Sequence, residues 1–148
     1  MKTLLVVLAA ATLAAQDAPV MIQEADLKWE AGPPSLPPGM KVVFLQGDMK
    51  KEGPFTFRAK LPADYKIPPH FHPGTEMVTV LSGGFHAALG DTFDASKAKG
   101  MKAGAFLSLP AKSPHFAFTK EETVIQVSGA GPWGITYVNP ADDPRARN

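Results

Sequence analysis

Apolar residues fall in short runs along most of this chain. The runs are rich in β-branched and aromatic residues and are mostly bounded by Gly, Pro, Asp or Lys. None keeps a helical period over about eleven residues, so the pattern favours strands over helices. The predicted strands are residues 41–45, 55–61, 77–81, 85–89, 105–109, 115–118, 124–127 and 135–138.

The number and spacing of these strands indicate the fold class. Eight short strands separated by turns at near-regular spacing are typical of an all-β sandwich or barrel. With 148 residues the chain suits one domain with a sizeable core, which we place at residues 16–140. One short helix is predicted at residues 94–99, where Asp94 can cap it. Residues 141–148 have nothing to bury and are predicted to form a flexible tail.

The first fifteen residues predict a cleaved secretory signal. Lys2 supplies a positive charge, an uncharged apolar run follows over residues 4–13, and small residues surround a cleavage point after Ala14 or Ala15. The run is too short to span a bilayer as a helix. We therefore expect a periplasmic or extracellular protein; the alternative is that the segment stays attached as an N-terminal anchor.

Charge and composition narrow the possible partners. Without residues 1–15 the chain loses one of its 15 basic residues, so 14 basic residues balance 14 acidic ones. A balanced chain lacks the basic surface that binds nucleic acid, and no basic amphipathic stretch predicts membrane binding after signal cleavage. The sequence contains no cysteine, which excludes disulfides, thiolate nucleophiles and cysteine-ligated metal sites.

One stretch, PPHFHPGTEMVTVLSGG, gathers metal-binding side chains. His70, His72 and Glu76 share one parity, so on an extended strand all three would point to one face. Two imidazoles and a carboxylate suit a divalent ion such as iron, manganese, zinc, copper or nickel. A third imidazole is predicted from His115. Its segment, GAFLSLPAKSPHFAF, indicates a hairpin that turns at Ser113 and returns His115 to the same face.

These residues resemble the two sequence motifs of the cupin superfamily, and the whole chain resembles a small secreted single-domain cupin. The first motif is matched by two histidines, a glutamate and a glycine at the family's spacing: His70, His72, Glu76 and Gly83. The second is matched by Gly104, Pro110 and His115. Asp64 and Lys112 replace motif glycines. Glycine at the second position often permits a positive φ, which a lysine adopts at some cost.

The resemblance implies a jelly-roll β-barrel that commonly forms a homodimer. It also implies one metal ion per chain, held inside the barrel by His70, His72, Glu76 and His115. His86, the fourth histidine, is predicted to be a pocket or surface residue rather than a ligand.

The chemistry available to such a site depends on the ion. Three imidazoles and a carboxylate leave one or two positions of an octahedral ion open for water, dioxygen or a chelating substrate. The sequence has no Ser-His-Asp arrangement, GxSxG, HExxH or phosphate-binding loop. Any reaction must therefore use the ion, with Glu76 as a candidate catalytic base.

We predict a metal-dependent oxidoreductase that activates dioxygen or peroxide at a mononuclear copper or iron centre. Its substrate would be a small organic compound or a carbohydrate. The alternatives are zinc, manganese or nickel at the site, a non-catalytic cupin that binds a metal or small ligand, and a cupin isomerase or lyase. A cupin fold alone does not choose among them.

Overall fold

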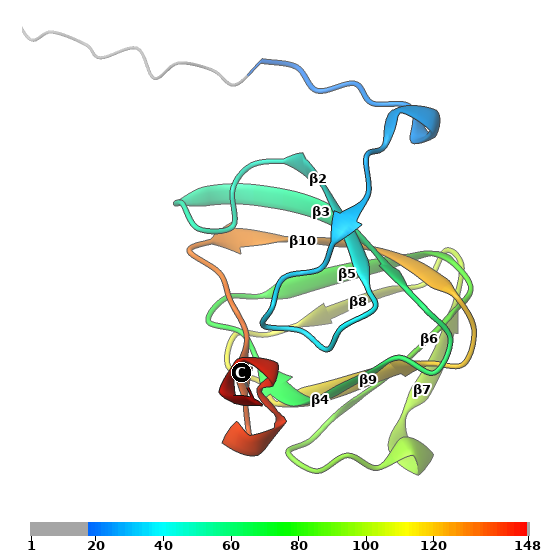
Figure 1. The fold of residues 1–148 in the computed structure, drawn as a ribbon, viewed down its shortest axis with the longest axis vertical. Coiled ribbons are helices and arrows are strands. Elements are labelled where there is room, and N and C mark those ends of the chain that lie inside the picture. Colours follow the sequence, from blue (N-terminus) through cyan, green and yellow to red (C-terminus); the bar gives the residue numbers. More distant parts are fainter. Residues whose placement is uncertain (1–17, 148) are drawn as a thin grey trace, which may run out of the picture.

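The computed structural model describes residues 18–147 of the chain (Figure 1). The predicted signal segment, residues 1–15, lies outside this part. Within residues 18–147, no helix combines the length and apolar character needed to cross a membrane.

Eleven strands in the described residues form two antiparallel sheets that face each other (Figure 1). The six-stranded sheet contains, in spatial order, β1 (Glu30–Ala31), β2 (Lys41–Gln46), β3 (Gly53–Leu61), β10 (Thr123–Gly131), β5 (Glu76–Ser82) and β8 (Phe106–Leu109). The five-stranded sheet contains β11 (Thr136–Tyr137), β4 (Lys66–Phe71), β9 (His115–Thr119), β6 (Gly84–Leu89) and β7 (Lys99–Lys102). The predicted all-β jelly-roll fold is confirmed.

Alternating side chains of the long strands build the core. In β3 every second residue from Phe55 to Leu61 is buried, and β10 repeats this alternation from Thr123 to Val127. These two strands pair along their whole length, from Thr123 opposite Leu61 to Gly131 opposite Gly53. Burial of each large apolar side chain stabilises the folded state by about 1.5–3 kcal/mol. The buried residues of β3 and β10 therefore hold the six-stranded sheet against the five-stranded one.

The eight predicted strands correspond to β2, β3, β5, β6, β8, β9, β10 and β11. Sequence patterning missed β1, β4 and β7. Strand β4 reads KIPPHF, and two prolines normally argue against a strand because they cannot donate to the ladder. The structure accommodates them where the β4–β9 register shifts between Ile67 and His70.

Four 3₁₀ turns complete the described fold: η1 (Glu24–Asp26), η2 (Ala95–Lys97), η3 (Pro140–Asp142) and η4 (Pro144–Arg147). Turn η2 lies inside the predicted helix, and the Asp94 side chain caps it by accepting a hydrogen bond of 3.0 Å from the Ser96 amide. Near the C-terminus, Arg145 forms an ion pair of 2.7 Å with Asp143. The flexibility of residues 141–148 stays a prediction.

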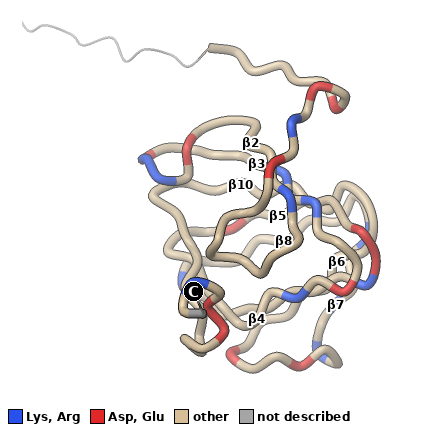
Figure 2. Tube along the Cα trace, in the orientation of Figure 1, with Lys and Arg blue, Asp and Glu red and all other residues tan. Residues whose placement is uncertain are grey.

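Along the backbone trace, positions of Lys and Arg are interspersed with positions of Asp and Glu in both loops and strands (Figure 2). This mixed surface encloses an interior in which, at one end of the space between the sheets, the apolar core gives way to three histidines.

Candidate metal centre

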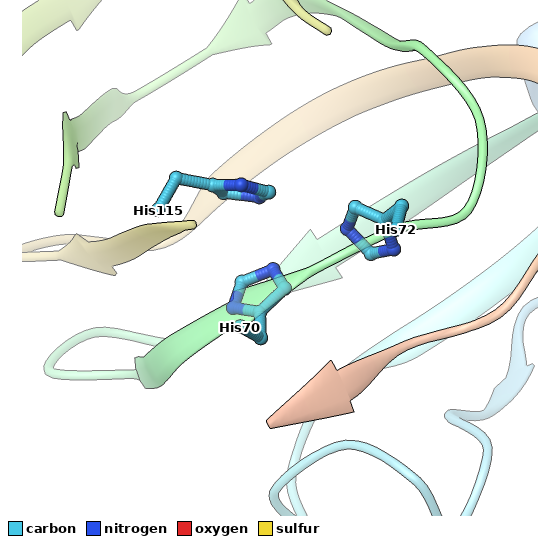
Figure 3. A group of neighbouring side chains, drawn as sticks. All are labelled: His70, His72 and His115. Carbon is cyan, nitrogen blue, oxygen red and sulfur yellow. The ribbon is translucent and has the colours of Figure 1, made fainter. Parts of the chain in front are cut away.

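His70, His72 and His115 converge between the two sheets (Figure 3). His70 in β4 and His115 in β9 are register partners, so their side chains leave adjacent strands side by side, with ring centroids 4.2 Å apart. His72 follows directly after β4. All three are buried, and one nitrogen of each lies within 4.8 Å of the other two. The histidine cluster predicted from the sequence can therefore hold a metal ion.

Backbone carbonyls fix the orientation of each ring. Nδ1 of His70 lies 2.7 Å from the Pro68 carbonyl oxygen, Nδ1 of His72 lies 2.7 Å from that of Gly134, and Nδ1 of His115 lies 2.9 Å from that of Ser113. A carbonyl oxygen only accepts, so each Nδ1 carries a proton, and in the neutral ring Nε2 then keeps the lone pair. The same second hydrogen bond orients metal-ligating histidines in general.

Two of these lone pairs have no partner within the described protein. Nε2 of His72 and Nε2 of His115 are buried without a hydrogen bond. A buried polar atom left unpaired costs about 1–3 kcal/mol. Neutral imidazoles whose lone pairs face one space fit a metal ion, which would satisfy both atoms.

Glu76 approaches this cluster from the opposite sheet, at the start of β5. Its carboxylate oxygens lie 3.7 Å from Nε2 of His72 and 3.3 Å from Nε2 of His115, and its side chain is 12% exposed. Ligand atoms next to each other on an ion with bonds of about 2.1 Å stand about 3.0 Å apart at octahedral angles and about 3.4 Å apart at tetrahedral ones. The carboxylate therefore lies close to the position of a fourth ligand. Acceptor atoms this close to one another also favour a cation between them.

The structure corrects how these residues come together. His70, His72 and Glu76 do not share one strand: the chain leaves β4 after Phe71, bends at Pro73 and begins β5 at Glu76 in the other sheet. Likewise β8 and β9 do not form a hairpin, because they belong to different sheets. Residue spacing does not distinguish a hairpin from a connection that crosses between sheets.

Burial favours the neutral form of two candidate ligands. It lowers the pKa of His70 well below the usual value of 6.5, and positive charge on His115 or His72 would lower it further. Burial also lowers the pKa of His72, although the Glu76 carboxylate acts in the opposite direction. At neutral pH both rings therefore present lone pairs, as metal binding requires.

The two motif glycines that this chain lacks mark left-handed backbone positions. Asp64 has φ 59° and Lys112 has φ 60°, which confirms the positive φ expected at Lys112. The Lys112 amide donates a hydrogen bond of 2.8 Å to the His72 carbonyl oxygen. The turn before His115 is thus tied to the backbone of another ligand.

A cavity of about 80 Å³ lies beside His70, His72 and Glu76. His70, His72, Glu76 and Ser35 supply its polar lining side chains. Its apolar lining includes Leu36, Met40, Phe44, Phe57, Ile125, Val127 and Trp133.

The proline-rich segment 32–40, which we call the strap, contributes Pro33, Ser35, Leu36 and Met40 to this wall. Two tyrosines hold the strap. The Tyr137 hydroxyl donates a hydrogen bond of 2.9 Å to the Ser35 carbonyl oxygen, and the Tyr65 hydroxyl donates to that of Pro37. Burial raises the pKa of both phenols, that of Tyr137 to about 12, so both keep the protons they donate.

Sequence reasoning missed both the strap and Trp133 as parts of the site. The signal for the strap was the run GPPSLPP, since prolines fix an extended path. The indole of Trp133 stacks on His72, with ring centroids 4.0 Å apart and planes at 14°.

His86 does not join the histidine cluster of the described residues. It projects from β6, opposite Phe118 of β9 and Gly100 of β7. Its ring stacks on Phe118 at 4.8 Å, and Phe118 in turn contacts Phe93 of the following loop. His86 therefore packs on the side of the five-stranded sheet that this loop covers, and the structure gives it no contact with the candidate ligands.

Comparisons with known proteins agree with this fold. A family model for the ChrR cupin-like domain matches residues 17–133. The fold resembles a putative acetylacetone dioxygenase from Methylibium petroleiphilum PM1, at 18% identity over 90% of both chains and a TM-score of 0.70. It also resembles the polyketide cyclase RemF from Streptomyces resistomycificus, at 18% identity over 84% of this chain and 88% of that one, with a TM-score of 0.66.

An oxalate oxidase in complex with the substrate analogue glycolate is 25% identical. That match covers 74% of this chain and 60% of the other, with a TM-score of 0.53. Among curated proteins, none matches this sequence.

Proposed function

Because the chain belongs to the ChrR cupin-like family, we propose that His70, His72, His115 and Glu76 hold one divalent transition metal ion. We further propose that the protein is an oxidoreductase that uses dioxygen or peroxide to oxidise a small organic or carbohydrate substrate. One observation carries the metal proposal: two buried imidazole nitrogens without partners face a carboxylate at 3.3 and 3.7 Å.

Copper or iron is the ion we favour, with zinc, manganese and nickel as alternatives. The donor set of nitrogen and oxygen atoms accepts all five. Affinity alone favours copper and zinc over iron and manganese, and iron becomes available if the protein folds and takes up its metal in the cytoplasm before export. We also propose that residues 1–15 direct the protein to the periplasm or the outside of the cell. There the chain would compete for metals without cytosolic buffering.

The metal ion and the residues around it would have different roles in the reaction. When bound, the ion would supply Lewis acidity and, for copper or iron, a redox centre for dioxygen or peroxide. The carbonyls of Pro68, Gly134 and Ser113 hold the three rings in register. Glu76, the only carboxylate among the described lining residues, can accept a proton from a substrate in the cavity. The apolar wall excludes water from that exchange.

The neighbouring structures support this reaction class without deciding it. A putative dioxygenase and an oxalate oxidase are among them, and so is a cyclase. One fold hosts many reactions, so the candidate ligands and the cavity support the proposed reaction more directly than the fold does.

Elemental analysis and oxygen consumption test the proposal together. We expect one copper or iron ion per chain, and consumption of dioxygen or peroxide with a panel of small organic compounds that stops when the ion is removed. Protein that holds only zinc and consumes neither oxidant would contradict the oxidoreductase, and would instead favour a non-catalytic metal-binding cupin.

We also propose that the protein forms a homodimer. The outer face of β5 and the edge strand β8 exposes Met77, Leu81 and Phe106, the last with 61% of its surface accessible. An apolar edge of this kind is typically covered by a partner. Light scattering of the full chain should give twice the monomer mass, and Phe106→Lys should return it to the monomer value.

A further inference from the structure

Three buried side-chain nitrogens in residues 18–147 have no hydrogen-bond partner. The proposed metal accounts for Nε2 of His72 and Nε2 of His115. The third is the indole Nε1 of Trp133. An indole N–H can only donate, and leaving a donor buried and unpaired costs about 1–3 kcal/mol. The Trp133 indole N–H is therefore a buried donor that lacks an acceptor in the described protein.

The position of Trp133 ties this donor to the metal centre. Its ring lies on His72 at 4.0 Å, nearly parallel to it, and forms part of the cavity wall together with His72 and Glu76. The next residue, Gly134, supplies the carbonyl that orients His72. One short segment between β10 and β11 thus fixes a candidate ligand and sets the indole beside it.

The cavity has room for the missing acceptor. Its volume of about 80 Å³ is several times the roughly 10–15 Å³ that one water molecule requires. Among the described lining residues there is no Lys or Arg, and most of the wall is aliphatic or aromatic. The hydroxyls of a carbohydrate would find few partners on this wall, and a multiply charged acid would find no cation apart from the ion.

We propose that Trp133 Nε1 donates a hydrogen bond to an oxygen atom of the substrate, and that the substrate is a small compound with an apolar body and an oxygen-donor head that binds the ion. The inference rests on the proposed function, because the head is held by the metal. A substrate of this kind excludes the carbohydrates and leaves small organic compounds as the substrate class. Trp133 is then a binding residue that selects and orients the substrate.

Nuclear magnetic resonance of the full chain tests the hydrogen bond without a variant of Trp133. The protein is labelled with ¹⁵N-tryptophan, loaded with diamagnetic Zn²⁺ and titrated with acetylacetone, a small diketone. Its two tryptophans give two indole signals, and Trp29→Phe assigns them. We expect the Trp133 indole proton to move downfield while that of Trp29 stays in place. A Trp133 signal that does not move at saturating diketone overturns the inference.

The affinity of the protein for acetylacetone tests the same hydrogen bond. Trp133→Phe keeps an aromatic ring against His72 but removes the donor, and Trp29→Phe is the matched control. With each protein loaded with Co²⁺, the visible spectrum follows binding of acetylacetone. Loss of one hydrogen bond should weaken binding about three- to tenfold in Trp133→Phe, with Co²⁺ affinity unchanged. Equal affinities in the two variants overturn the role of Trp133.

Oxalate serves as a hydrophilic probe of the substrate class. Wild-type protein that binds oxalate more tightly than acetylacetone, or does not bind the diketone, overturns the class proposed. These outcomes differ from a failure of the metal proposal, in which wild-type protein takes up no Co²⁺ and no probe has a centre to bind.

Discussion

A histidine presents its lone pair to a metal reliably only when its other ring nitrogen is held. In this chain all three candidate ligands have that second contact, with backbone carbonyl oxygens at 2.7–2.9 Å. Two of the three carbonyls lie two residues before their histidine, so the local backbone of Pro68 and Ser113 already orients His70 and His115. His72 depends instead on Gly134, a residue 62 positions away.

Replacing His72 with alanine should remove the ion. The substitution deletes one of four donors and leaves Nε2 of His115 buried and unpaired. Metal affinity should fall by more than about 100-fold, beyond the loss that follows removal of an outer partner. His86→Ala is the matched control, since His86 stacks on Phe118 away from the cluster. Equal metal content in the two variants would contradict the ligand assignment.

Lys112 offers a prediction about stability. A non-glycine residue at φ 60° strains the folded state by about 1–2 kcal/mol. Glycine removes this strain, but its greater backbone freedom also stabilises the unfolded state by about 0.4–1 kcal/mol. Lys112→Gly should therefore raise the free energy of unfolding in urea by about 0.5 kcal/mol. Lys112→Ala, which keeps the strain, should change it little. A glycine variant less stable than the alanine variant would be inconsistent with this strain.

At the scale of elements, the sequence pattern predicted the positions of strands better than the paths of the connections between them. Alternation located β3 and β10, whereas the prolines of KIPPHF hid β4, the strand that carries His70. Spacing predicted the group of candidate ligands, but the predicted path of the chain between His72 and Glu76 was wrong. Contacts such as Tyr137 with Ser35, 102 residues apart, leave no local signal. The run GPPSLPP could therefore signal an extended segment, but neither its place in the cavity wall nor that of Trp133 could be predicted.

The strap should loosen when its anchor is removed. Tyr137→Phe deletes the hydrogen bond to the Ser35 carbonyl and should lower the free energy of unfolding by about 0.5–1.5 kcal/mol. Hydrogen exchange should accelerate at the Leu36 amide, which bonds to Pro33 inside the strap. Amides of the β3–β10 ladder serve as the internal control. An unchanged exchange rate at the Leu36 amide would mean that the Tyr137 hydroxyl does not hold the strap in place.

At the scale of the whole molecule, two sheets enclose ionisable groups that folding keeps out of water. The pKa values of His70 and His72 are lowered in the folded protein, chiefly by burial. The unfolded chain binds protons on these residues near the usual value of 6.5, and the folded chain does not. Protons therefore favour the unfolded state when the pH falls below that value.

Metal-free protein should accordingly lose stability as the pH is lowered from about 7.5 to 5, because that range passes through the unfolded pKa of histidine. The stability is fully present above this pKa and declines below it. Urea unfolding at a series of pH values measures the effect, and the double variant His70→Ala, His72→Ala should flatten it. Stability that is constant or rises toward pH 5 in the parent protein would contradict the burial of neutral rings.

Anomalous diffraction from crystals of the metal-loaded full chain tests the central claim most directly. Data collected at the absorption edge of the bound element locate the ion without any assumption about its ligands. We expect one peak per chain, enclosed by Nε2 of His70, His72 and His115 and by the Glu76 carboxylate. An absent peak, or a peak anywhere else in the molecule, would contradict it.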